Sequence, residues 1–154
     1  MSDFLEDNSQ RLARNINDLL QELRVSLVGV QILFGFLLSI VFTDAYRRAG
    51  GVPHAAHLVA VSFSLISMAS MTAPAAWHRL LFRRRQRPEI LRVGTRLAIV
   101  GLGSLAIAMS ATIFLLIDVV LGGWSALLGA ALTFVGIGVL WFVLPLHRRV
   151  STAK

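Results

Sequence analysis

The stretch ELRVSLVGVQILFGFLL, from Glu22 to Leu38, decides how this chain folds. Glu22 and Arg24 stand at its start, and an apolar run without charge continues from Val25 to Thr43. A helix needs about 20 consecutive apolar residues to cross the hydrocarbon core of a bilayer. We therefore expect this segment to be the first membrane span, with its two charged residues held at one face of the membrane.

The composition of the chain indicates a membrane protein rather than a soluble domain. Of its 154 residues, 56% are hydrophobic and 15% are charged, whereas about a quarter of the residues in soluble domains are charged. The mean hydropathy is +0.72. The charges cluster at the ends of the chain and between long uncharged runs, which is typical of helices that face lipid. The length allows one compact bundle and no second domain.

Hydropathy divides the chain into four apolar spans with polar ends. The expected spans cover residues 25–43, 57–77, 97–117 and 124–146, which together form a membrane domain from 25 to 146. Residues 11–24 carry apolar side chains at spacings of three and four, which predicts an amphipathic helix at the membrane interface. We expect residues 1–10 to be disordered and residues 147–154 to form a basic cytoplasmic tail. The predicted fold is all-α: an integral membrane bundle of four transmembrane helices preceded by an N-terminal amphipathic helix.

Spans three and four are rich in small side chains at four-residue spacing. The pairs are Ala106 and Ser110, Ala108 and Thr112, Ala126 and Ala130, and Gly129 and Thr133. Small residues at this spacing let two helices approach closely in a membrane. We expect these faces of spans three and four to pack against each other or to form the contact of a homo-oligomer.

The basic residues are distributed unevenly between the two sides of the expected bundle. The net charge is +7, almost wholly from arginine. Arg47 and Arg48 lie on one side, and the other thirteen of the 15 basic residues lie on the side of the N-terminus. This asymmetry predicts that both termini are cytoplasmic. Because the arginines flank apolar spans, we expect them to meet anionic lipid headgroups and not nucleic acid.

Polar residues gather near the inner ends of spans one, two and three. The predicted cytoplasmic polar cluster comprises Glu22, Arg24, His78, Arg79, Arg92 and Arg96. Glu22 and Arg24 lie about 200° apart around a helix and therefore cannot pair with each other. We expect Glu22 to pair with His78, Arg79 or an arginine of span three. Such a cluster is either a structural clamp that fixes helix order or a ligand or proton site in which His78 titrates near neutral pH.

The connection between spans two and three is the most basic stretch of the chain. It contains Arg83, Arg84, Arg85 and Arg87. Arginines just outside an apolar span attract the anionic headgroups of the cytoplasmic leaflet. We therefore predict that these four residues bind lipid headgroups.

Gln31 is the amide inside the first apolar run. It lies seven residues beyond Arg24, so it is on nearly the same helix face and about 10 Å deeper in the bilayer. A lone amide in hydrocarbon is costly unless it is hydrogen-bonded. Two interpretations remain open. One is an interhelical hydrogen bond to Ser67, Ser70 or a backbone carbonyl, and the other is a polar path that begins at Arg24 and is lined by Gln31.

Four residues at the outer ends of the spans are of types that bind metals. They are Asp44, His54, His57 and Asp118. His54 and His57 are three residues apart on one helix face, a spacing that serves some metal sites. No tight ligand motif accompanies them, and the absence of cysteine excludes thiolate sites and disulfides. We therefore expect interfacial histidines at the start of span two and predict neither a metal nor a cofactor.

Three motifs together point to a known family. They are ELRV followed by GVQILFGFLL in span one, APAAWHRL at the end of span two and WFVLPL at the end of span four. With them the chain, from Asp18 to Arg148, resembles a domain-of-unknown-function family of small four-span membrane proteins that is common in actinobacteria. The matching positions are Glu22, Leu23, Arg24, Val25, Gly29, Val30, Gln31, Phe34, Gly35, Pro74, His78, Arg79, Trp141 and Pro145.

The resemblance implies a four-span fold in the bacterial cytoplasmic (inner) membrane and no established activity. Some members of the family carry the label sodium:proton antiporter. Carboxylate-driven exchange of protons or sodium normally requires an acid at depth, and no Asp or Glu lies within the four expected spans. The residues of this chain therefore give that label little support.

Patterns typical of catalysis are also missing from the sequence, since it has no paired acids, serine triad or phosphate-binding glycine loop. We therefore predict that the chain is not an enzyme. The leading hypothesis is a non-enzymatic membrane scaffold or regulatory component. The alternative is a small proton or cation transporter or channel with a polar path along Gln31.

Overall fold

The computed structural model describes residues 2–81, 87–145 and 147; for 2–13, 15–17, 77–81 and 87–92 it describes the backbone without the side chains. Every element in these ranges is helical. In chain order the elements are α1 (Ser2–Ile40), α2 (Asp44–Arg48), α3 (Gly51–Leu81), α4 (Arg87–Val120), α5 (Trp124–Gly138) and the π-helical η1 (Val139–Val143). The predicted all-α fold class is confirmed.

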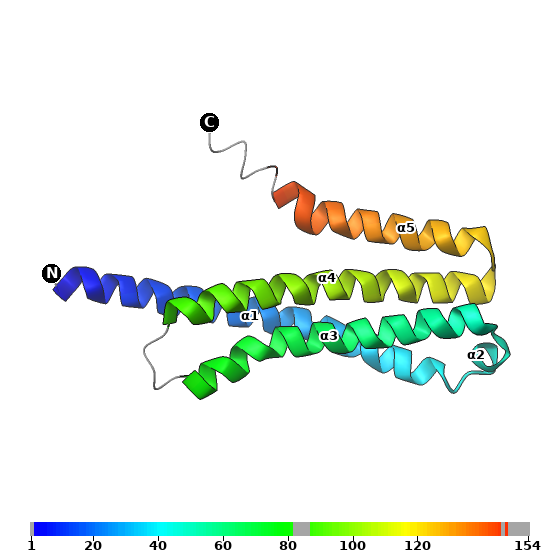
Figure 1. Cartoon of the computed structure of the whole chain (residues 1–154), viewed down its shortest axis with the longest axis horizontal. Helices are drawn as coiled ribbons and strands as arrows, with labels where there is room; N and C mark the ends of the chain where they lie inside the picture. The colour runs from blue at the N-terminus through cyan, green and yellow to red at the C-terminus, as the bar shows by residue number, and fades with distance from the viewer. Residues whose placement is uncertain (1, 82–86, 146, 148–154) are drawn as a thin grey trace.

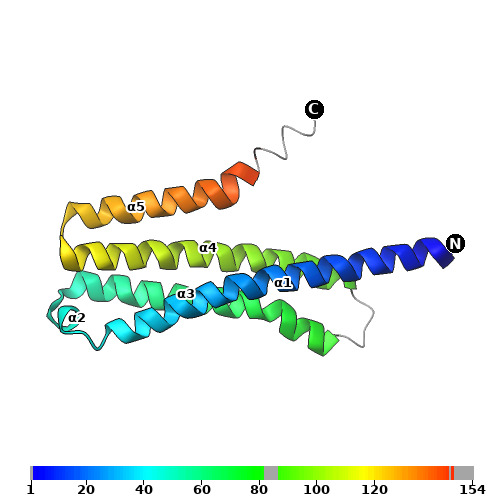
Figure 2. The same cartoon turned by 180° about the vertical axis from the view of Figure 1, so that it is seen from behind.

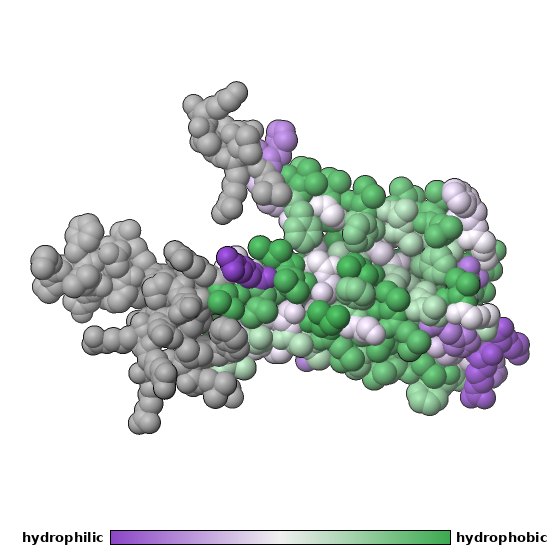
Figure 3. All heavy atoms as spheres, viewed as in Figure 1, coloured by the Kyte–Doolittle hydropathy of each residue, from purple (hydrophilic) through white to green (hydrophobic). Residues whose placement is uncertain are grey.

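Four segments of these helices are long and apolar enough to cross a membrane. They are Asp18–Ile40, Gly51–Ala76, Val93–Val120 and Trp124–Val143. Apolar side chains cover the sides of the bundle, and hydrophilic side chains gather at the end where α2 lies (Figure 3). The arrangement of four spans expected from hydropathy is therefore confirmed. The limits differ from the predicted ones by up to seven residues, and only the start of the fourth span, Trp124, coincides.

α1 is a single helix of 39 residues and begins earlier than the sequence predicts. Residues 2–10, which we expected to be disordered, are helical. The amphipathic segment 11–24 continues into the first span without a break, because neither proline nor glycine separates the two. Leu19 and Leu23, near the end of this segment, pack on the core of the bundle.

The bundle is built around the pair α3 and α4, which share the most extensive helix contact in the described part of the chain. α1 crosses this pair and contacts both helices (Figure 2). In the described part of the chain α5 packs mainly on α4 and lies on the opposite side of α4 from α3 (Figure 1). The start of α1 and the end of η1 lie at one end of the bundle, while α2 lies at the other (Figure 1).

α1 meets the other helices through one stripe of residues that are seven apart. Leu23, Val30 and Leu37 are buried along this stripe. Leu23 and Val30 belong to a cluster with α3 and α4, and Leu37 belongs to a second cluster nearer α2. A spacing of seven keeps a single stripe in contact when helices cross at about 20°. Most of the remaining surface of α1 is exposed.

α3 and α4 approach each other closely at Gly101. A Cβ atom at this position would lie 2.9 Å from Cγ of Met71 and 3.4 Å from the carbonyl oxygen of Ser67. The Ser67 hydroxyl donates a hydrogen bond of 2.8 Å to the Gly101 carbonyl. The absence of a side chain at Gly101 therefore permits both the close contact and the hydrogen bond between the helices.

Spans three and four pack against each other, which was one of the two predicted uses of their small side chains. Gly129 of α5 lies directly against the Ile117 side chain of α4, and Ala126 is fully buried. Four small residues of α4 are also buried inside the chain: Ala106, Ala108, Ser110 and Thr112. The small residues of α4 and Gly129 and Ala126 of α5 therefore pack inside one chain, while Ala130 and Thr133 are half-buried. The homo-oligomer contact through these faces stays a prediction.

Two prolines shape the inner ends of the helices. The C-terminal end of α3, which contains Pro74, diverges from α4 (Figure 1). Pro145 has no N–H to donate to the carbonyl of Trp141, and its ring crowds that carbonyl. The preceding turn widens into η1, in which the Leu144 N–H donates to the Val139 carbonyl five residues back. Trp141 on this turn packs against the core cluster shared by α1, α3 and α4.

Candidate functional site

The end of the bundle where α2 lies holds an aromatic cluster formed by Tyr46, His54 and His57. The Thr43 side chain accepts a hydrogen bond from the Tyr46 N–H and caps α2. This short helix places the Tyr46 ring 4.4 Å from His54 and 5.0 Å from His57, measured between ring centroids. Sequence reasoning selected both histidines but missed Tyr46, because a tyrosine beside arginines is also typical of a membrane interface.

The two histidines differ in how their ring nitrogens are satisfied. Nδ1 of His54 lies 2.7 Å from the Gly50 carbonyl oxygen, and because a carbonyl only accepts, this nitrogen carries the proton. His57 is 5% exposed, and its Nδ1 has no hydrogen-bond partner among the described residues. The cluster therefore contains one imidazole fixed by the backbone and one buried imidazole with an unused nitrogen.

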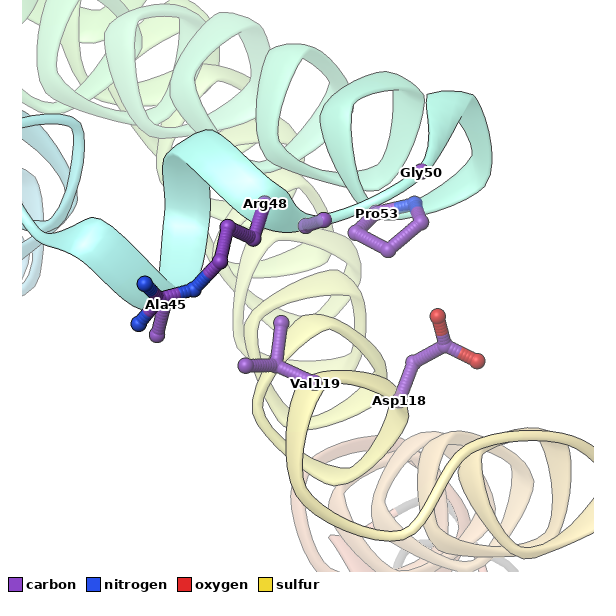
Figure 4. Close-up of a pocket in the computed structure, with 7 residues that line it drawn as sticks. Ala45, Arg48, Gly50, Pro53, Asp118 and Val119 are labelled. Carbon is purple, nitrogen blue, oxygen red and sulfur yellow. The ribbon is translucent and has the colours of Figure 1, made fainter.

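A pocket of about 350 Å³ lies beside this cluster, between α2, the start of α3 and the end of α4 (Figure 4). Its lining residues are Ala45, Arg48, Ala49, Gly50, Pro53, Asp118 and Val119. The Asp118 carboxylate points toward Pro53, whereas the Arg48 side chain runs toward Ala45 (Figure 4). The pocket is thus lined by one acidic side chain, Asp118, and one basic side chain, Arg48, which do not form an ion pair with each other.

The structure does not assemble the four outer residues into a set of metal ligands. No three His, Cys, Asp or Glu side chains lie close enough to hold a metal ion within the residues described. Asp118 lines the pocket, and Asp44 is exposed in the first turn of α2. The physical reason is that the Tyr46 ring lies beside both His54 and His57 and occupies the space next to them.

The inner polar cluster is described only in part. Glu22, Arg24 and Arg96 are exposed and form no ion pair within the described side chains. His78 and Arg79 belong to α3, and Arg92 belongs to α4, but their side chains lie outside the described residues, as does the side chain of Arg87. Arg83, Arg84 and Arg85 and the tail from 148 to 154 lie outside the described residues altogether. Glu22 does not pair with Arg96, and its predicted pairing with His78, Arg79 or another arginine of span three concerns side chains outside the described residues and stays a prediction.

Gln31 and Ser67 are not brought together. Gln31 is exposed on the outer surface of α1, and its amide has no hydrogen-bond partner in the part of the chain that the structure describes. Ser67 is fully buried between α3 and α4, where its hydroxyl is engaged by the Gly101 carbonyl. Ser70 is half-buried on α3. Neither the predicted hydrogen bond between Gln31 and these serines nor a polar path lined by Gln31 and Ser67 is formed within the chain.

An apolar groove of about 320 Å³ lies between α1, α4 and η1. It is lined by Val25, Ser26, Gly29, Leu33, Leu102, Leu105, Met109 and Trp141. A Cβ atom on Gly29 would meet nothing within 4 Å, so this wall of the groove is open. The groove offers van der Waals contact to an apolar chain, and its only side-chain polar group on the α1 wall is the Ser26 hydroxyl, which donates to the Glu22 carbonyl.

Fold and site together define a multi-pass helical membrane protein. Among the described residues, no acidic side chain is buried in its core. The chain belongs to a family of unknown function, DUF6328, whose sequence pattern matches residues 5–145. No curated protein and no solved structure matches the chain. This family assignment agrees with the resemblance to an uncharacterised family that the motifs indicated. The description of the family names no biochemical activity.

Proposed function

We propose that the chain is a non-enzymatic scaffold or regulatory component of the bacterial inner membrane, with both termini in the cytoplasm. In this role it acts through its surfaces: the lateral faces of its spans contact lipid or other helices, and its basic inner end contacts anionic headgroups. The single observation that carries the proposal is the way the polar groups inside the spans are used. Among the described residues, the hydroxyls of Ser67, Ser110 and Thr112 hold helices together or bond to their own backbone. The Ser64 hydroxyl and Nδ1 of His57 are buried without a partner, and the Gln31 amide faces outward, so these three groups form no continuous polar row with the others.

The hydroxyls buried near α4 illustrate this use. Ser110 and Thr112 donate to the carbonyls of Ala106 and Ala108 in their own helix, at 2.8 and 2.7 Å. Ser67 donates across to α4. Because these donors are satisfied, they do not require water or ions between the helices. This supports a packed helical component over the alternative of a proton or cation transporter with a path along Gln31.

A flux assay separates the two functions. Purified protein in liposomes is placed under a pH gradient and, separately, a sodium gradient, and the internal ion is followed with a fluorescent dye. We expect no flux above that of empty liposomes. Flux that the Gln31→Ala variant abolishes would contradict the scaffold and favour the transporter.

The lipid contact is tested by comparing the two ends of the bundle. We expect phosphatidylglycerol nanodiscs to raise the unfolding temperature of the protein above its value in phosphatidylcholine nanodiscs. The triple variant Arg83/Arg84/Arg85→Gln should lose most of this difference, because three of the cations that face the anionic headgroups are removed. The Arg47/Arg48→Gln variant, altered at the opposite end, is the matched control and should keep it. Equal losses in both variants would refute a headgroup role specific to the inner connection.

Orientation in the membrane is tested with single cysteines, since the natural chain has none. In intact cells, a cysteine replacing Gly50 should react with a membrane-impermeant maleimide, and a cysteine replacing Gln86 should react only after the cells are opened. The reverse pattern would place the termini outside.

A further inference from the structure

The exposed face of α1 carries a second stripe of residues at the spacing used for helix association. Its members are Val28, Gln31, Gly35 and Leu38, which we call the Gln31 stripe, and all four are exposed. They follow one another at intervals of three, four and three residues, which is the a/d pattern of a helix pair. Gln31 and Leu38 each come one residue after a member of the buried stripe and therefore lie about 100° around the helix from it.

The Gln31 amide makes this stripe unsuited to contact with lipid alone. It has two N–H donors and a carbonyl acceptor, and none has a partner in the described structure. Gln31 lies about 10 Å from Arg24 and about 14 Å from Ile40 along the helix axis, so its amide lies near the middle of the span. A primary amide in hydrocarbon gains strongly from a partner, because lipid tails offer neither donor nor acceptor.

The chain itself supplies no such partner, and the other close-packing faces are already occupied. Gly129 of α5 packs on Ile113 and Ile117 of α4, and the small residues Ala106, Ala108, Ser110 and Thr112 of α4 are buried inside the chain. On α1, by contrast, a Cβ atom on Gly35 would meet nothing within 4 Å. An exposed glycine one turn from an exposed amide lets another helix backbone come close enough for a hydrogen bond at Gln31.

We propose that the Gln31 stripe is the contact surface of a parallel homodimer in which α1 packs against α1 of a second copy. Copies of one chain share one orientation in the membrane, so a two-fold axis along the membrane normal brings the two Gln31 side chains to the same depth. An amide is self-complementary, because each side chain donates an N–H to the carbonyl of the other. A polar side chain at a core position of such a pair also fixes the register of the helices.

The ends of the stripe agree with this arrangement. Arg24 precedes Val28 by four residues on the same face and is exposed at the inner end. Its long side chain reaches the headgroup region and the water there, so the two arginines of a dimer separate toward anionic headgroups and do not face each other in hydrocarbon. The contact therefore extends from Val28 outward. This inference is independent of the proposed scaffold function, since a transporter could dimerise in the same way.

The dimer is tested with the full chain in liposomes, by energy transfer between copies labelled at a cysteine that replaces Gly50. We expect energy transfer that depends on the protein-to-lipid ratio, and we expect Gln31→Leu to raise the dissociation constant about tenfold by removing the paired hydrogen bonds. Ile32→Leu, a change at the exposed neighbouring position, should leave it unchanged. Because the Gln31 side chain is exposed and forms no hydrogen bond with a described residue, the thermal unfolding of the Gln31→Leu monomer should equal that of the parent.

Oxidative cross-linking locates the contact independently. A cysteine replacing Leu38 should form a disulfide-linked dimer, and a cysteine replacing Phe36, exposed on the far side of α1, should not. A chain that stays monomeric in liposomes overturns the proposal, as does a dimer that Gln31→Leu does not weaken or that cross-links equally through Phe36. Purification with a different membrane protein in fixed ratio, in place of a second copy, also overturns it.

Discussion

The α3–α4 pair and the α1 helix show two ways of crossing a membrane in one chain. Along α3 and α4, glycine, alanine and hydroxyl residues are buried, and the backbones meet closely at Gly101. Of the described α1 side chains, only Leu23, Val30 and Leu37 are buried, with partly buried leucines beside them, and the Gln31 amide is exposed. The comparison teaches that close backbone contact holds the centre of the bundle together, whereas side-chain interdigitation attaches α1 to it. Substitutions that add or remove volume should therefore act differently in the two regions.

The largest effect is expected where the backbones are closest. Gly101→Leu places a side chain where even a Cβ atom would lie 2.9 Å from Met71, so α3 and α4 must separate. We expect the free energy of unfolding to fall by about 3 kcal/mol, measured by SDS titration in mixed micelles with circular dichroism. Gly103→Leu is the control, because a Cβ there meets nothing within 4 Å. Equal destabilisation by both variants would show that helix separation at Gly101 is not the cause.

The next largest effect is expected on α1. Leu37 is fully buried in the cluster with Ala60 and Leu115, so Leu37→Ala leaves a cavity there. The expected loss is about 2 kcal/mol of unfolding free energy, from lost van der Waals contacts. Ile32→Ala removes a similar volume from a side chain that is 69% exposed and should change the unfolding free energy little. If the two variants behave alike, α1 is not held by its buried stripe.

A smaller effect is expected between α4 and α5. Gly129→Leu collides with the end of the Ile117 side chain, which can rotate away, so the expected cost is about 1 kcal/mol. Because the described contacts of α5 with the bundle are mainly with α4, the change should appear as faster hydrogen exchange of α5 amides and not as global unfolding. Gly136→Leu, where a Cβ meets nothing within 4 Å, is the control. Unchanged exchange in the Gly129 variant would contradict the contact.

The smallest effect is expected from the single hydrogen bond between α3 and α4. Ser67→Ala removes the 2.8 Å bond to the Gly101 carbonyl without adding volume. Such bonds in membrane proteins contribute about 0.6 kcal/mol on average, so the loss should be measurable but well below that of Gly101→Leu. Ser62→Ala, at an exposed position of α3, is the matched control. A loss comparable to that of Gly101→Leu would mean that hydrogen bonding, not close approach, holds the pair together.

The candidate site was less predictable from the sequence than the fold. His54 and His57 were found because imidazoles at the start of an apolar span are conspicuous, but their neighbour Tyr46 depends on the short helix α2, which sequence reasoning missed. The sequence also singled out Gln31 as an amide inside an apolar span, but it did not show whether the side chain faces the other helices or the lipid. Which α1 side chains are buried depends on which face of the helix turns toward α3 and α4. Val30 and Gln31 are neighbours in the sequence and point about 100° apart around the helix axis, so the sequence alone leaves open which of them is buried.

The sequence by itself determined the four spans and the uneven distribution of charge, because solubility in lipid is a local property that each segment of about 20 residues carries alone. Only the tertiary structure decided that α1 is continuous from Ser2, that Ser67 bonds to Gly101 and that Gln31 faces outward. In a bilayer the hydrophobic effect does not distinguish one apolar face from another. The choice between faces therefore depends on shape and close contact between helices, which no single segment contains.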